Sequence, residues 1–170
     1  MRIIVPFTRL RPETYLALEK TDYDYETEYV GISDDAYWTL LAKLWKAGEA
    51  FIIVEHDIVP TETALFQLAA CDQDWCAWPY DYFSQAYGLA CMKFEAELIS
   101  RHPNLIEQIA QMSDTEHPPK HWCRLDAWLE RTLWASGEPL HRHIGEPLRH
   151  IRDEPGPAKP SHGCVLPPGA

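Results

Sequence analysis

The chain has 170 residues, 46% of them hydrophobic, and a formal net charge of -11. This length suits one compact core and excludes two ordinary domains. The charge repels nucleic acid and anionic lipid, so either partner would need a local basic patch. The five cysteines are an odd, sparse set, which favours reduced thiols in a cytoplasm over a disulfide framework. With no signal-peptide or membrane-span pattern, we expect a cytoplasmic protein without membrane attachment.

The first third of the chain predicts alternating strands and helices. An apolar, β-branched run predicts a strand that stops at Pro6, and Pro12 suits the first turn of a helix. A further helix has apolar residues at three- and four-residue spacing, as a core-facing stripe requires. The predicted elements are a strand at 2–5, a helix at 12–19, a strand at 29–32, a helix at 34–47 with Ser33 as N-cap, and a strand at 51–54.

The remaining elements continue the alternation. They are a helix at 61–70 capped by Thr61, strands at 75–78 and 88–94, helices at 95–101, 104–112 and 122–135, and an extended segment at 141–151. This order predicts a single α/β domain over 1–152. Because residues 153–170 are rich in proline and glycine, we expect them to form a disordered tail.

Glu55-His56-Asp57 directly follows the apolar run at 51–54. In open α/β sheets, ligands bind beyond the carboxyl ends of strands. Residues i and i+2 of an extended segment project to the same side, so both carboxylates can face one Mg²⁺ or Mn²⁺ ion. The competing interpretation is that these acids cap the next helix or face water.

The late histidines form a second group, with His141 and His143 two residues apart and His150 further on. A histidine beside the carboxylates would favour Mn²⁺ over Mg²⁺. Zinc is an alternative, held by these three histidines or by some of the cysteines, although no Cys-x-x-Cys pair occurs. For any single histidine, the competing interpretation is an ordinary exposed or hydrogen-bonded residue, which is the commoner case.

Asp126 falls in the first turn of the helix predicted at 122–135. There it can serve as a general base that takes the proton of an acceptor hydroxyl. The alternative is that it has no catalytic role and is stabilised by the positive end of the helix dipole. An aromatic cluster between the predicted strands suits sugars and bases as well as a core. Its members are Trp75, Trp78, Tyr80, Tyr82, Phe83 and Tyr87.

Several motifs, taken in order, resemble those of small GT-A-type glycosyltransferases, including short versions encoded by bacteriophages and bacteria. The motifs are Val5-Pro6, Arg11-Pro12-Glu13-Thr14, the run from Phe51 to Ile58, the run from Trp75 to Tyr80, the run from Gly88 to Phe94, and the late histidines. The resemblance implies a Rossmann-like, GT-A-type mixed sheet flanked by helices. It also implies a nucleotide-diphospho-sugar donor held through a metal ion, Mn²⁺ or Mg²⁺.

The resemblance also assigns nucleotide-side residues. Pro6, Thr8 and Arg9 match the first loop that meets the nucleotide, and Glu55 and Asp57 match the acidic motif. The first acid of that motif is usually Asp. The longer Glu55 is therefore expected to contact the metal through water or to bind the donor ribose.

For the reacting end, the resemblance assigns His150, or failing that His143, as a metal ligand beside Asp57. Asp126 matches the helix-borne acid that serves as base in inverting members. The short chain leaves little room for an acceptor subdomain, so the acceptor, the sugar and the oligomeric state stay open.

We therefore expect a metal-dependent hexosyl- or pentosyltransferase acting on a hydroxyl acceptor. For a phage protein, the acceptor could be a modified base of DNA facing the late arginines Arg124, Arg131, Arg142, Arg149 and Arg152. The alternatives are a nucleotidyltransferase or metal-dependent phosphohydrolase, which would need further carboxylates, and a non-catalytic nucleotide-binding or interaction module.

Overall fold

The computed structural model describes residues 1–33, 35–80, 88–115, 117–121 and 124–151. The tail predicted at 153–170 lies outside the described residues, so its disorder stays a prediction. Tyr82, Phe83 and Tyr87 of the aromatic cluster lie outside them as well. No helix within the described ranges is long and apolar enough to cross a membrane.

A six-stranded mixed sheet forms the centre of the molecule, with strand order β2-β1-β3-β6-β5-β7. The strands are β1 (Arg2–Phe7), β2 (Tyr25–Tyr29), β3 (Phe51–Val54), β5 (Trp75–Ala77), β6 (Cys91–Phe94) and β7 (His141–Arg142). β2, β1 and β3 are parallel, β6 is antiparallel to both β3 and β5, and β7 is parallel to β5. A separate two-stranded antiparallel sheet pairs β4 (Ile58–Val59) with β8 (Arg149–His150).

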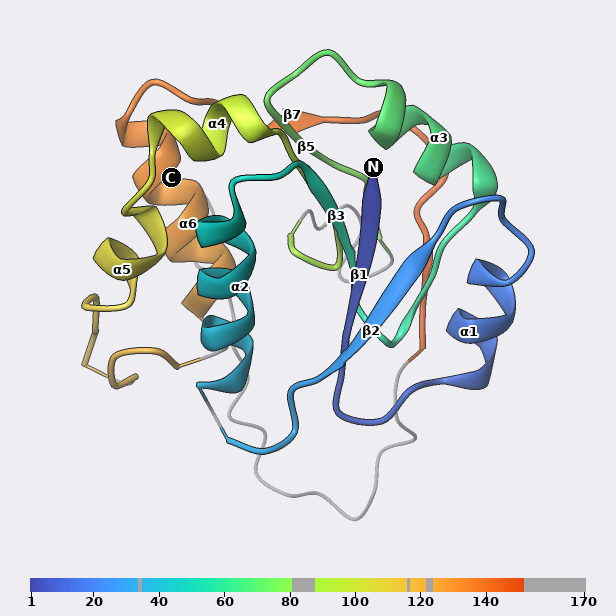
Figure 1. The fold of residues 1–170 in the computed structure, drawn as a ribbon, viewed down its shortest axis with the longest axis horizontal. Coiled ribbons are helices and arrows are strands. Elements are labelled where there is room, and N and C mark those ends of the chain that lie inside the picture. Colours follow the sequence, from blue (N-terminus) through green and yellow to red (C-terminus); the bar gives the residue numbers. More distant parts are fainter. Residues whose placement is uncertain (34, 81–87, 116, 122–123, 152–170) are drawn as a thin grey trace.

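Helices cover both faces of the sheet (Figure 1). They are α1 (Pro12–Leu18), α2 (Ala36–Ala47), α3 (Glu62–Ala70), α4 (Ala96–Arg101), α5 (Leu105–Ile109) and α6 (Leu125–Ala135). α2, α4, α5 and α6 pack on one face, and α1 and α3 on the other. β3 supplies both cores, since Ile53 faces the first and Ile52 the second. The predicted α/β class with a mixed, helix-flanked sheet is confirmed.

α2 shows how the sequence sets these contacts. Leu41, Leu44 and Trp45 recur at helical spacing and are almost fully buried. Gly48 ends the helix with a φ of 71°, a left-handed conformation that glycine adopts without strain. The predicted N-cap, Ser33, is wrong: the helix begins after Asp35, and Ser33 instead hydrogen-bonds the Asp35 side chain at 2.6 Å.

Two strand predictions are also corrected. β1 continues through Pro6 to Phe7, because beyond Ile4 it pairs on only one side, with β2, and an unpaired flank tolerates a residue without an N–H. β2 occupies 25–29 rather than 29–32. Its Tyr-Glu-Thr-Glu-Tyr sequence forms the edge of the sheet, where polar side chains are solvated and no apolar run is needed.

Candidate active site

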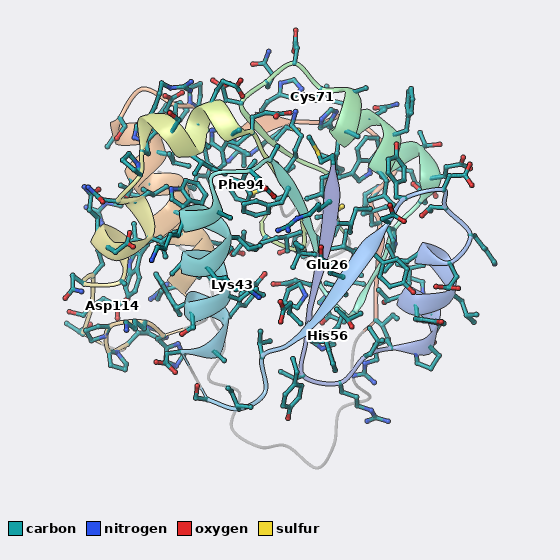
Figure 2. All side chains as sticks on the ribbon, in the orientation of Figure 1. Glu26, Lys43, His56, Cys71, Phe94 and Asp114 are labelled. Carbon is teal, nitrogen blue, oxygen red and sulfur yellow. The ribbon has the colours of Figure 1, made fainter. Side chains whose placement is uncertain are left out.

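A cavity of about 620 Å³ opens beyond the carboxyl ends of the parallel strands β1, β2 and β3. Its walls come from Pro6 near the end of β1 and Thr8 just after it, residues 30–33 after β2, Tyr37 at the start of α2, and residues 55–57 after β3. Figure 2 shows His56 at this end of the sheet and Cys71 at the opposite end. Loops that follow adjacent parallel strands are where α/β folds bind ligands.

Asp57 meets His150 through the small β4–β8 sheet. Ile58 pairs with His150 in that sheet, and the Ile151 N–H donates to the Asp57 carbonyl at 2.7 Å. This pairing places His150 Nε2 3.1 Å from Asp57 Oδ2. Partial burial alone would raise the pKa of Asp57, but the His150 hydrogen bond and the nearby positive charge of His56 outweigh it and lower that pKa. Asp57 is therefore ionised at neutral pH.

Glu55 lies on the same wall but in a different electrostatic environment. The Tyr37 hydroxyl donates to Glu55 Oε1 at 3.1 Å. Desolvation, together with the negative charges of Asp126 and Asp57, raises the pKa of Glu55. None of the described groups that shift this pKa is a cation. A bound cation would offset the repulsion.

Asp126 joins these acids from the first turn of α6. Burial raises the pKa of Asp126, while a hydrogen bond from the Leu89 N–H opposes the shift. Gly88 makes room for the carboxylate, because a Cβ there would lie 2.5 Å from Asp126 Oδ2. A carboxylate whose pKa is raised toward neutrality has the property needed of a general base.

His56 is held mainly by its backbone. Thr14 of α1 donates to the His56 carbonyl at 2.8 Å, and Thr8 Oγ1 lies 3.4 Å from His56 Nε2. These contacts fix the turn that separates Glu55 from Asp57. The His56 ring also lines the cavity.

The structure brings together most of the residues that the sequence singled out, but not all of them. Pro6, Thr8, Glu55 and Asp57 line the cavity, whereas Arg9 is exposed and is not part of its wall.

His143 does not join Asp57. It follows β7, three strands from β3, or about 14 Å at the usual strand spacing. Its N–H instead donates to the Ala77 carbonyl, and its ring stacks on Trp78 with the centroids 5.4 Å apart. Trp75 and Trp78 of the aromatic cluster are buried in the core.

Sequence reasoning missed three parts of the site. Tyr37 was expected only in the core stripe of its helix, yet its hydroxyl reaches Glu55. Thr14 was named only within the resemblance motif at 11–14, and residues 30–33 only as part of a predicted strand and an N-cap, without a role in the site. The one available signal was position, since each follows or flanks a strand that ends at the cavity.

The donor set fits a hard divalent cation. Among the described residues, Asp57 Oδ1 is buried without a hydrogen-bond partner, while Oδ2 pairs with His150. A buried carboxylate oxygen without a hydrogen-bond partner lowers the stability of the fold unless a ligand or an ion binds it. Carboxylate oxygens with one imidazole are ligands that suit Mn²⁺, and Mg²⁺ to a lesser degree.

Comparisons by sequence find no matching family and no matching curated protein. Two of the solved structures that resemble the chain in fold overlap with most of it. A197 from STIV is 12% identical with a TM-score of 0.54, and the match covers 95% of this chain and 98% of that one. A glycosyltransferase involved in the glycosylation of the major capsid of PBCV-1 is 8% identical with a TM-score of 0.50, and the match covers 84% of this chain and 81% of that one.

At such identities the likeness concerns the fold alone. The mixed, helix-flanked sheet resembles the fold of that glycosyltransferase, in line with the GT-A-type fold that the sequence resemblance implied.

Proposed function

We propose that this protein is a metal-dependent glycosyltransferase that moves a sugar from a nucleotide-diphospho-sugar to a hydroxyl acceptor. The observation that carries the proposal is the pairing of Asp57 with His150 at the mouth of a cavity formed where three parallel strands end. The fold supports a nucleotide-sugar donor. Glu55 and Asp126 are further acids near Asp57, and we assign donor binding to Glu55 and base catalysis to Asp126.

Asp57 and His150 are the residues we assign to the metal. When bound, Mn²⁺ or Mg²⁺ supplies positive charge for the departing diphosphate. Asp57 offers its unpartnered Oδ1, and its lowered pKa keeps the carboxylate ionised. Glu55, held by the Tyr37 hydroxyl, is assigned to the donor ribose or to a water beside the ion.

Asp126 is the proposed base in an inverting reaction. The acceptor oxygen forms a bond to the anomeric carbon, the bond from that carbon to the diphosphate oxygen breaks, and the acceptor proton passes to an Asp126 oxygen. The electron pair of the broken bond leaves with the nucleoside diphosphate. In a retaining reaction Asp126 would lose this role.

A DNA acceptor receives little support from the late arginines. Arg124 pairs with Asp114 at 2.8 Å, Arg149 lies 3.4 Å from Glu13, and Arg142 pairs with Glu130. Because these cations are already matched by acids, they add little positive potential toward phosphates. Arg152 lies outside the described residues.

Slow donor hydrolysis tests the proposal without knowledge of the acceptor. Purified protein is incubated with UDP- or GDP-linked sugars and Mn²⁺, and released nucleotide is identified by chromatography. We expect nucleoside diphosphate and free sugar, both lost in Asp57→Asn. Nucleoside monophosphate as the product would instead identify a phosphohydrolase.

The control is Glu107→Gln, a charge-matched change at an exposed position of α5. It should retain the full rate. If no sugar nucleotide is cleaved and none raises the melting temperature in the presence of Mn²⁺, the proposed function is wrong.

A further inference from the structure

A second group of metal-binding side chains lies away from the cavity. Cys71, His141 and His143 each offer one ligand atom, and these three atoms lie within 4.8 Å of one another. Neither the sheet edge that carries them nor their chemistry belongs to the proposed transfer reaction. We propose that they bind a zinc ion that ties the end of α3 to the edge strand β7.

The backbone brings these residues together from distant parts of the sequence. Cys71 is the C-cap of α3, and its carbonyl accepts a hydrogen bond from the buried Lys93 ammonium. His141 pairs with Cys76 in the parallel β5–β7 register, and the His143 N–H donates to the Ala77 carbonyl. Both elements are therefore anchored to the sheet independently of any ion.

The rings already face the sulfur. His141 and His143 are two residues apart on an extended segment, so their side chains project to the same side. Their ring centroids are 4.9 Å apart in an edge-on arrangement, and the Trp78 indole supports the back of His143. Trp78 is fixed in turn by a 3.0 Å hydrogen bond from its Nε1 to the Glu146 carbonyl.

The donor set selects the metal. Thiolate sulfur with two imidazole nitrogens suits Zn²⁺, whereas Mg²⁺ and Mn²⁺ prefer carboxylate oxygens. Ligands around tetrahedral zinc are separated by roughly 3.3 to 3.8 Å, given bond lengths of about 2.0 to 2.3 Å. The group must therefore contract by only about 1 Å, which rotation of an exposed His141 side chain can supply.

One further residue contacts the group. The Cys76 thiol shares a hydrogen bond with Cys71, which places a second sulfur behind the first. Because His141 is exposed, the fourth coordination position faces solvent. Zinc at this place would stabilise β7, which pairs with β5 over two residues.

Cobalt substitution tests the site directly. Tag-free protein is stripped with a chelator and titrated with Co²⁺, and the spectrum is read for thiolate-to-metal charge transfer and for tetrahedral ligand-field bands. We expect both signals to saturate at one ion per chain and to be displaced by Zn²⁺. In Asp57→Asn, which lacks the proposed transferase metal ligand, zinc should raise the melting temperature by several degrees, and Mn²⁺ at the same concentration should not.

Three variants make the outcome decisive. Cys71→Ser should abolish the charge-transfer band. His141→Ala, an exposed change that leaves the fold intact, should weaken zinc affinity by more than about 100-fold, beyond the loss expected for an outer-shell partner. Asp57→Asn should bind zinc as the parent does, which separates this site from the proposed transferase site.

Binding that persists unchanged in Cys71→Ser and His141→Ala would place the metal elsewhere and overturn the proposal. Failure of the parent protein to bind Co²⁺ or Zn²⁺ would overturn it as well. Either result would leave the donor-hydrolysis test of Asp57 unaffected.

Discussion

Two regions of the sheet carry chemically different groups of side chains: the cavity beyond the ends of three strands and the cluster at the edge strand β7. The cavity beyond β1, β2 and β3 is lined by the carboxylates of Glu55 and Asp57, with Asp126 close enough to influence Glu55. Burial is the main cause that raises the pKa of Glu55 and of Asp126, and the charges of Asp126 and Asp57 add to the effect on Glu55. The cluster between α3 and β7 gathers one sulfur and two imidazoles. The two proposed sites therefore differ in donor atoms, and this difference would let the first select Mn²⁺ or Mg²⁺ and the second select Zn²⁺.

The two groups also differ in their expected effect on stability. Crowded carboxylates cost folding free energy when they are ionised, as functional sites commonly do. The sulfur–imidazole cluster carries no such repulsion between anions. We therefore expect the cavity to govern activity and the cluster to govern thermal stability, and the following changes are chosen to break or sharpen that division.

The largest effect is expected for Asp126→Asn. Loss of the base should lower kcat by about 10²- to 10⁴-fold, while Mn²⁺-dependent donor binding is retained. The rate of donor hydrolysis, in which water is the acceptor, together with donor titration calorimetry, measures both quantities. A loss of less than tenfold would remove Asp126 from the role of base.

Gly88→Ala should act through Asp126. Its new Cβ would lie 2.5 Å from Asp126 Oδ2 and displace the carboxylate, lowering kcat by about 10- to 100-fold. In an Asp126→Asn background the same change should have little further effect on kcat, because coupled positions are not additive. Two independent, additive losses would contradict the contact.

His150→Ala should weaken Mn²⁺ binding by more than the roughly 10- to 100-fold typical of an outer-shell partner, and leave zinc binding by Cys71 and its two histidines unchanged. The matched control is His102→Ala, because His102 Nε2 also lies 3.1 Å from a carboxylate oxygen, that of Glu138, outside the cavity. Calorimetric titration with each metal distinguishes the two variants. Equal losses in both would mean that His150 has no special role.

The smallest effect concerns Glu55→Gln in the absence of metal. In the folded protein Glu55 keeps its proton at pH values above about 4.3, the pKa of glutamate in the unfolded chain. The free energy of unfolding of the wild type therefore falls as the pH rises from about 4.3 toward the raised pKa of the folded state. The variant has no carboxylate to ionise at this position, so its stability does not fall in this way. At pH 8 its melting temperature should be roughly 2 to 4 °C above that of the wild type. Melting curves from pH 5 to 8 check the sign, and an unchanged slope would mean that Glu55 is not buried as described.

Local patterns predicted much of this molecule. The strand at 51–54 could be predicted from the sequence because a strand buried on both faces is an uninterrupted apolar run, and Glu55 and Asp57 follow it directly. Thr61 was recoverable as an N-cap, and its Oγ1 accepts a hydrogen bond from the Ala64 N–H. β2 was not, since its exposed edge lacks an apolar pattern.

Contacts between distant segments set the remainder. Asp57 meets His150 across 93 positions through a two-residue strand pair, which is too short to leave a sequence signal. The same holds for Cys71 with the two histidines of the zinc cluster, because the usual close cysteine spacing is missing. The sequence therefore named His143 and His150 together, and only the fold separated them.

Paramagnetic broadening by Mn²⁺ tests this separation most directly. Histidine ring resonances of the protein with UDP are recorded by NMR while Mn²⁺ is added at substoichiometric levels. The account predicts that His150 and the cavity-lining His56 broaden before His141 and His143, and that this order is lost in Asp57→Asn. Broadening of His143 before His150, or a pattern unchanged in Asp57→Asn, would contradict it.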